Sequence, residues 1–154
     1  CFLINRVDDV LMIDCCKSEQ SDALVAALSQ IGVDPNNVKS FIATHGHPDH
    51  VGGSGLFVQA EKWIHSHDAG RLSAEQSKEF KEIDCDAGEI SGLSFTLLGH
   101  HTEGSIALFD PITRCLFCGD HICFFGDKLP SEGLVTFGDD LRAKTETFVA
   151  EWSQ

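Results

Sequence analysis

The sequence of 154 residues has no run of about 18 apolar residues, the shortest stretch typical of a transmembrane helix. Its N-terminal segment also lacks the basic start and apolar stretch of a signal peptide. Basic residues are scarce, since 11 Lys and Arg stand against 24 Asp and Glu, for a formal net charge of -13. Such a charge works against binding to a phosphate backbone or an anionic membrane. We therefore expect a soluble cytoplasmic protein that does not bind membranes and for which nucleic-acid binding is disfavoured but not excluded.

The seven cysteines do not form the dense, even-numbered set of a small secreted domain. They are scattered through the chain and are expected to be reduced thiols. The first residue is Cys1 rather than Met, which suits either a lipid-modified cysteine or a segment of a longer chain. Because the apolar run Phe2-Leu3-Ile4 follows at once without a flexible tether, we favour the segment.

The length and a hydrophobic content of 42% fit one globular domain over residues 1–154 and leave no room for a second. Residues 2–5 and 10–14 are short apolar runs around a turn and predict a β-hairpin. Ser21 is a candidate N-cap of a helix that ends near Gly32. The apolar face of this helix is expected to pack on a sheet and consists of Leu24, Val25, Leu28 and Ile31.

Further strands are predicted at residues 38–44, 63–65 and 95–98, with a second hairpin at 105–109 and 114–117. The segments between them are predicted as a turn at 34–37, a strand-to-helix loop at 44–53, a helix at 73–82 and a turn at 88–92. A last helix is predicted after Asp139, with one side made of Leu141, Thr145, Phe148, Val149 and Trp152. Strands that alternate with helices but also form hairpins indicate an α/β domain with a mixed sheet.

The loop after the strand at 38–44 carries the motif His45-x-His47-x-Asp49-His50. Composition alone would produce this pattern in about two of a thousand such chains. Imidazole and carboxylate groups are ligands of zinc, and also of iron and manganese. Residues two apart in an extended loop point to the same side, so His45 and His47 can share one ion while Asp49 and His50 reach another. The motif therefore predicts two adjacent metal sites.

Two further candidates lie at loop ends, where a rigid scaffold commonly carries its functional groups. His101 opens the block His101-Thr102-Glu103-Gly104-Ser105, and Asp120 follows Gly119 at the end of a strand. In order and spacing, these blocks and the histidine motif resemble the metallo-β-lactamase superfamily over nearly the whole chain. The strand that ends in Asp14 also resembles an early strand of that family.

The resemblance implies a four-layer αββα sandwich with mixed sheets and a metal centre at one edge. By resemblance, the ligands of a first ion are His45, His47 and His101, and those of a second are Asp49 and His50, with Asp120 bridging the two. The implied cofactor is one or two zinc ions per chain, although iron and manganese also suit these ligands. Asp49 is the candidate catalytic residue, because a carboxylate beside both ions can orient a water molecule and accept its proton.

One feature departs from the family pattern. Family members usually complete the second site with a histidine in a loop after the last helix, and no histidine follows His121 here. We therefore expect a longer domain shortened at both ends, with a complete first site and weaker occupancy of the second.

The remaining histidines have no motif to support a ligand role. His100 and His121 adjoin ligand candidates, so they are expected either to orient them or line a pocket, or to be solvated or capping groups. His65 and His67 are expected to end a strand and to precede a helix that Ser66 caps, rather than to bind metal.

A cysteine pair and a set of glycines are also expected to be structural. Cys115 and Cys118 lack the second pair of a zinc knuckle and are predicted to pack in the core. Gly52, Gly53 and Gly55 lack the lysine of a phosphate-binding loop and are expected to allow close backbone approach beside the metals.

These observations predict a zinc-dependent hydrolase that uses metal-activated water on a small ester, thioester, lactone or lactam. Glyoxalase II-like thioesterases of the family carry a helical C-terminal domain that this chain lacks. Lactamases of the best-known subclass have Cys where Asp120 stands, so both options are less favoured.

Three alternatives remain at this point. A phosphodiesterase or RNA nuclease would share the fold, but the net charge of -13 disfavours it. A mononuclear iron enzyme similar to the family's persulfide dioxygenases would use His45 or a neighbouring histidine, His101 and Asp120 as ligands. The last alternative is not an enzyme: it is a fragment that folds poorly or binds partners without turnover.

Overall fold

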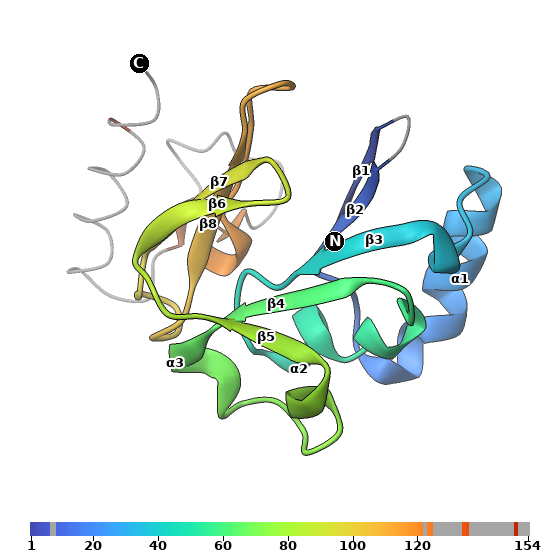
Figure 1. Cartoon of the computed structure of the whole chain (residues 1–154), viewed down its shortest axis with the longest axis horizontal. Coiled ribbons are helices and arrows are strands. Elements are labelled where there is room, and N and C mark those ends of the chain that lie inside the picture. The colour runs from blue at the N-terminus through green and yellow to red at the C-terminus, as the bar shows by residue number, and fades with distance from the viewer. Residues whose placement is uncertain (7–8, 122, 125–133, 136–149, 151–154) are drawn as a thin grey trace.

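The computed structural model describes residues 1–6, 9–121, 123–124, 134–135 and 150. Two β-sheets dominate this part of the chain: a five-stranded sheet in the order β1-β2-β3-β4-β5 and a four-stranded sheet in the order β6-β7-β8-β9. Figure 1 shows the first in blue to green and the second in yellow to orange beside it. A further pair joins β10 (Cys123–Phe124) to β11 (Leu134–Val135).

The five-stranded sheet is mixed, as the sequence predicted. Its strands are β1 (Phe2–Arg6), β2 (Asp9–Ile13), β3 (Val38–Ile42), β4 (Glu61–His65) and β5 (Phe80–Ile83). The strands β1 and β2 form the predicted antiparallel hairpin, whereas β2 to β5 run parallel to one another. Parallel strands bring their carboxyl ends to one edge of a sheet, which is where ligand sites form in such sheets.

The four-stranded sheet is antiparallel throughout. It consists of β6 (Ala87–Ile90), β7 (Leu93–Leu97), β8 (Ile106–Asp110) and β9 (Cys115–Phe117), and the last two form the second predicted hairpin. The turn predicted at 88–92 is wrong over its first residues, because Gly88 to Ile90 pair with β7. Only Ser91 and Gly92 turn the chain, with φ angles of 50° and 74°.

Among residues 1–121 that the structure describes, the helices are short, apart from α1 (Ser21–Gln30). The others are α2 (Pro48–Val51) and α3 (Ser66–Ala69), with 3-10 turns η1 (Ser18–Gln20), η2 (Pro35–Asn37), η3 (Ser54–Leu56), η4 (Gln76–Lys78) and η5 (Gly119–His121). In α1, Ser21 is the first helical residue rather than the N-cap, and Gly32 follows the helix with a φ of 73°. Leu28 is buried, but Val25 and Ile31 are exposed, so the predicted apolar face is narrower than expected.

Two hydrophobic clusters lie on opposite faces of the five-stranded sheet. Leu11 and Ile13 point into the cluster that both sheets share, whereas Met12 between them points to the other face. That second cluster includes Leu28 of α1 and Val51 of α2, so the helices cover the outer face of this sheet. In the part of the chain that the structure describes, no helix has the length and apolarity needed to span a membrane.

The helix predicted at 73–82 is wrong. This segment contains η4 and then β5, which pairs in parallel with β4. Phe80 and Ile83 are buried in different hydrophobic clusters on opposite faces of the sheet, as expected for residues three apart on a strand, whereas a helix would place them on one face. The loop predicted at 44–53 contains α2, which begins at Pro48, where the missing N–H group of proline costs no helical hydrogen bond. The last predicted helix, from Asp139, lies outside the described residues.

Candidate metal centre

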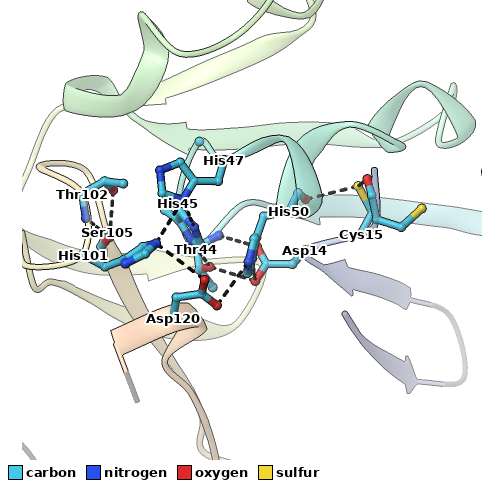
Figure 2. A network of polar contacts seen from close by, with 12 residues as sticks. Asp14, Cys15, Thr44, His45, His47, His50, His101, Thr102, Ser105 and Asp120 are labelled. Carbon is cyan, nitrogen blue, oxygen red and sulfur yellow. Dashed lines mark hydrogen bonds and ion pairs between the residues drawn. The ribbon is translucent and has the colours of Figure 1, made fainter. Parts of the chain in front are cut away.

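The candidate site lies where loops from the two large sheets meet (Figure 2). Asp14 directly follows β2, and the loop after β3 carries Thr44 to His50. The opposite sheet contributes the loop between β7 and β8, and η5 after β9. The backbone N–H of Ile106 in β8 donates to the carbonyl of Thr44 at 2.9 Å, so the two sheets are joined directly beside the site.

Three imidazole rings converge in a first ligand group, which consists of His45, His47 and His101. Nε2 of His45 lies 3.1 Å from Nδ1 of His47, and Nε2 of His101 lies 3.0 Å from the same atom. Nitrogen ligands of one tetrahedral zinc ion, each about 2.0–2.1 Å from the metal, would lie about 3.4 Å from one another. The spacing of these nitrogens therefore fits a shared metal ion.

A second ligand group combines His45 and His50 with the carboxylate of Asp120. Nε2 of His50 lies 3.2 Å from Oδ1 of Asp120. The other carboxylate oxygen of Asp120 lies 3.6 Å from Nε2 of His101. Asp120 thus faces both groups, which is the position of a ligand that two neighbouring ions could share.

Asp14 orients two of these histidines. Its carboxylate accepts hydrogen bonds from the backbone N–H of Thr44 at 2.7 Å and from the Thr44 hydroxyl at 2.8 Å. It also pairs with Nδ1 of His50 at 2.9 Å. Because the Thr44 hydroxyl donates to Asp14, it accepts from the Nδ1–H of His45, 3.2 Å away. In both histidines Nδ1 therefore carries the proton, and the lone pair of Nε2 faces the ligand groups.

Burial and neighbouring charges separate the histidine pKa values. Burial, with the nearby rings of His50, His101 and His47, lowers the pKa of His45 to about 2, so this ligand is neutral. Burial also lowers the pKa of His101 below its ordinary value, against the charge of Asp120. Burial acts to lower the pKa of His50 too, but the hydrogen bond and charge of Asp14 and the charge of Asp120 raise it above its ordinary value.

The structure brings together all but one of the predicted ligands. Asp49 lies on α2 with an exposed side chain, and it belongs to neither ligand group among the described residues. Its charge nevertheless acts to raise the pKa of His50 and opposes the lowering of the pKa of His101, so it lies within electrostatic reach of the centre.

The other histidines lie outside both groups in the described part of the chain. His65 rather than Ser66 caps α3, since its Nδ1 accepts from the backbone N–H of His67 at 3.3 Å. The rings of His100 and His121 lie 5.1 Å apart. Burial, together with His100 and His101, lowers the pKa of His121 to about 4.

The glycine prediction is confirmed in part. A Cβ atom on Gly52 would lie 2.5 Å from the carbonyl oxygen of Pro48, and one on Gly53 would lie 2.9 Å from Sγ of Cys16. Gly55 has open space instead.

The prediction that Cys115 and Cys118 pack in the core is wrong. Cys115 is exposed, because it begins β9 at the edge of its sheet, and Cys118 is only half-buried. Neither residue packs in the core as predicted. Cys15 is a buried thiol next to the centre, and its Sγ donates to the carbonyl of His50 at 3.2 Å. Burial raises the pKa of Cys15 to about 12.

Sequence reasoning did not assign Asp14, Thr44 or Asp68 to the site. The position of Asp14 after a buried strand was a usable signal, since strand ends at this edge carry functional groups. Asp68 accepts hydrogen bonds from the backbone N–H groups of Gly46 and Gly104, which lie 22 and 36 positions away in the sequence. No local pattern could therefore have indicated its contacts with the loops of the site.

Comparisons with known proteins agree with this geometry. A family model described as the metallo-beta-lactamase superfamily matches residues 1–151. Metallo-beta-lactamase domain-containing protein 1 of Xenopus laevis is 33% identical over 106 residues, which cover 67% of this chain and 44% of that protein. An N-acyl homoserine lactonase from a Bacillus species is 28% identical over 101 residues, which cover 60% of this chain and 40% of that protein. The chain spans less than half the length of these two relatives.

A solved structure also resembles the chain. An N-acyl homoserine lactone hydrolase with the product N-hexanoyl-L-homoserine at its catalytic metal center aligns with a TM-score of 0.72 and 17% identity. The alignment covers 98% of this chain and 76% of that one, and it confirms the αββα sandwich that the family resemblance implied. With its family model matched from residue 1 to 151, the chain belongs to the metallo-β-lactamase superfamily.

Proposed function

We propose that this chain carries the centre of a zinc-dependent hydrolase that acts on a small ester, thioester, lactone or lactam, with a lactone as the first substrate to test. The observation that carries the proposal is the convergence of three imidazole nitrogens at 3.0 and 3.1 Å beside a carboxylate. The similarity to an N-acyl homoserine lactonase, at 28% identity, supports the choice of a lactone.

The residues of the chain divide into those that would hold metal and those that hold the ligands in place. His45, His47 and His101 would hold a first ion, and His50 and Asp120 would contribute to a second. Bound there, zinc would supply a nucleophile at neutral pH by lowering the pKa of a water molecule to about 7. Asp14 keeps the Nε2 lone pairs of two ligands directed at the centre through the contacts described above.

Asp49 remains the proposed catalytic residue. Its exposed carboxylate is free of both ligand groups in the described part of the chain, so it suits a proton acceptor better than a ligand. We expect Asp49→Asn to lower kcat by about 10²–10⁴-fold, the usual contribution of a general base. Metal content per chain should stay unchanged. A loss of metal in this variant would instead make Asp49 a ligand.

Activity with and without metal tests the whole proposal. The purified chain is incubated with N-hexanoyl homoserine lactone, p-nitrophenyl esters, thioesters and nitrocefin, before and after treatment with EDTA. We expect turnover of the lactone that EDTA removes and added zinc restores, with one to two zinc ions per chain by elemental analysis. An absence of metal-dependent turnover on every carbonyl substrate would contradict the proposal.

An iron enzyme is the second candidate, because His45, His50 and Asp120 offer two imidazoles and one carboxylate, a set that suits non-haem iron. Iron as the bound metal, with oxygen consumption on glutathione persulfide, would favour this candidate.

The cytoplasmic location and a small-molecule substrate remain predictions, and a nuclease role stays disfavoured by the net charge of -13.

A further inference from the structure

Asp68 belongs to neither ligand group, yet its carboxylate joins the two loops that carry the first one. The side chain lies in α3 and is fully buried. Its Oδ2 accepts hydrogen bonds from the backbone N–H of Gly46 and from the hydroxyl of Thr102, both at 2.7 Å. Its Oδ1 accepts from the backbone N–H of Gly104 at 3.1 Å and from Nε of Arg71 at 3.2 Å.

These partners lie directly beside the first ligand group. Gly46 separates His45 from His47, and Thr102 follows His101. The first loop leaves β3 of the five-stranded sheet, whereas the second connects β7 to β8 of the four-stranded sheet. One carboxylate therefore connects ligands that come from different sheets.

The two glycines show how closely the loops approach Asp68 and its neighbours. A Cβ atom on Gly104 would lie 2.7 Å from both Cβ and the backbone nitrogen of Asp68. A Cβ atom on Gly46 would lie 2.9 Å from Cβ of Arg71 and 3.1 Å from the carbonyl oxygen of Asp68. Both loops thus contact this segment through their backbones, which leaves little room for either loop to shift toward it.

We propose that Asp68 is a positioning residue that sets the distance of His101 from His45 and His47, and thereby the metal affinity of the first ligand group. The inference rests on the metal centre proposed above. Because two of the hydrogen bonds come from backbone N–H groups, the carboxylate fixes the loops themselves rather than one side chain. Loss of an acceptor would let the two loops separate and spread the three nitrogens.

Asp110 provides a matched control. It is also fully buried, and its carboxylate accepts from Nη2 of Arg6 at 3.0 Å, the backbone N–H of Ile112 at 3.0 Å and the hydroxyl of Thr113 at 2.8 Å. Like the partners of Asp68, the partners of Asp110 are an arginine, a backbone N–H group and a threonine hydroxyl. None of the partners of Asp110 is a candidate ligand or adjoins one. A substitution at Asp110 therefore reports the general effect of removing a buried, hydrogen-bonded carboxylate.

The experiment compares Asp68→Asn with Asp110→Asn in the otherwise unchanged chain. In Asp68→Asn, an amide NH₂ replaces one carboxylate oxygen and faces hydrogen-bond donors. Zinc affinity is measured by competition with a chromophoric chelator, the ligand field by the visible spectrum of the cobalt form, and stability by urea unfolding of the metal-free chain. We expect Asp68→Asn to weaken zinc binding by about 10–100-fold and to shift the cobalt spectrum. Asp110→Asn should leave affinity and spectrum as in the wild type.

A second pair of variants, with smaller changes, tests the inference even if Asp68→Asn does not fold. Thr102→Val removes the hydroxyl that donates to Asp68, whereas Thr102→Ser keeps it. We expect weaker zinc binding in the valine variant and wild-type binding in the serine variant.

Two outcomes overturn the inference. Equal zinc affinity in Asp68→Asn and Asp110→Asn would reduce Asp68 to a stabilising residue and leave the proposed metal centre intact. Failure of the wild-type chain to bind zinc or cobalt would overturn the metal centre, and this inference with it.

Discussion

The two ligand groups of the centre differ in how the fold holds them. In the first group, the loops are fixed through their backbones, by the hydrogen bonds that Gly46 and Gly104 donate to Asp68. In the second group, a ligand side chain is fixed directly, because Asp14 pairs with Nδ1 of His50. The first arrangement sets the distance between two loops, whereas the second sets the direction of one imidazole ring.

The electrostatic surroundings of the two groups differ as well. The first group is made of imidazoles alone, and burial keeps His45 and His101 neutral by lowering their pKa values. The second group includes Asp120, whose side chain is 34% exposed, and carboxylates raise the pKa of His50. A set of three imidazoles and a mixed set of two imidazoles and one carboxylate therefore lie side by side and share His45. We therefore expect the first group to dominate metal affinity, because the raised pKa of His50 favours a proton that competes with a metal ion in the second group.

The largest effect is expected from removing a ligand of the first group. Structural zinc sites bind with about 10–16 kcal/mol shared among four ligands, so His101→Ala should weaken zinc binding by about a hundredfold or more. Hydrolytic activity should fall with it. Chelator competition measures the affinity, and His67→Ala is the control, since His67 lies in neither group among the described residues. Equal affinity of the two variants would show that the first group does not dominate.

A smaller and more selective effect is expected at Asp14. Asn tolerates the positive φ of 54° at this position, so Asp14→Asn changes the hydrogen bonds rather than the backbone. We expect zinc affinity to fall by about 10–100-fold, as for other residues that orient metal ligands. The loss should be larger for the second ion bound than for the first. Stepwise titration with zinc measures both, and an unchanged second step would contradict direct fixation of His50 by Asp14.

The smallest effect on metal binding is expected at Asp110, where the change should appear in stability instead. Burial alone would raise the pKa of Asp110, but hydrogen bonds from Thr113 and Ile112 and the charge of Arg6 outweigh it and hold the pKa below its ordinary value. Ionised Asp110 therefore stabilises the fold above the unfolded pKa of about 3.9. That contribution is lost as the pH falls from there through the lower folded pKa.

We expect Asp110→Asn to lower the free energy of unfolding by about 1–3 kcal/mol at neutral pH, because buried donors lose an acceptor. The difference from the wild type should shrink as the pH falls below about 4, because Asp110 of the unfolded chain takes up a proton first and that of the folded chain only at lower pH. Urea unfolding of both metal-free chains between neutral and acidic pH measures the difference. A difference that stays constant across this range would contradict the depressed pKa.

Local patterns predicted most strands but failed where burial depends on a distant partner. The hairpin of β1 and β2 was predictable, because two apolar runs flank a short turn. The strand β5 was not predictable, because the polar composition of residues 73–82 gave no sign of a buried strand. Phe80 and Ile83 are buried only when β5 pairs with β4. The opposite happened at Val25 and Ile31: their helical spacing predicted burial, but both side chains are exposed.

The types of candidate ligand, and the loop that carries most of them, can be read from the amino-acid sequence alone. His45, His47 and His50 lie within six residues, so local chain geometry keeps them together whatever the rest of the fold does. The contacts of these residues with the rest of the site depend instead on the packing of distant segments. His47 and His101 are 54 positions apart, and Thr102 and Asp68 are 34 apart. Such contacts exist because two sheets pack face to face and bring their loop ends to one edge, and no spacing within a single segment encodes that packing.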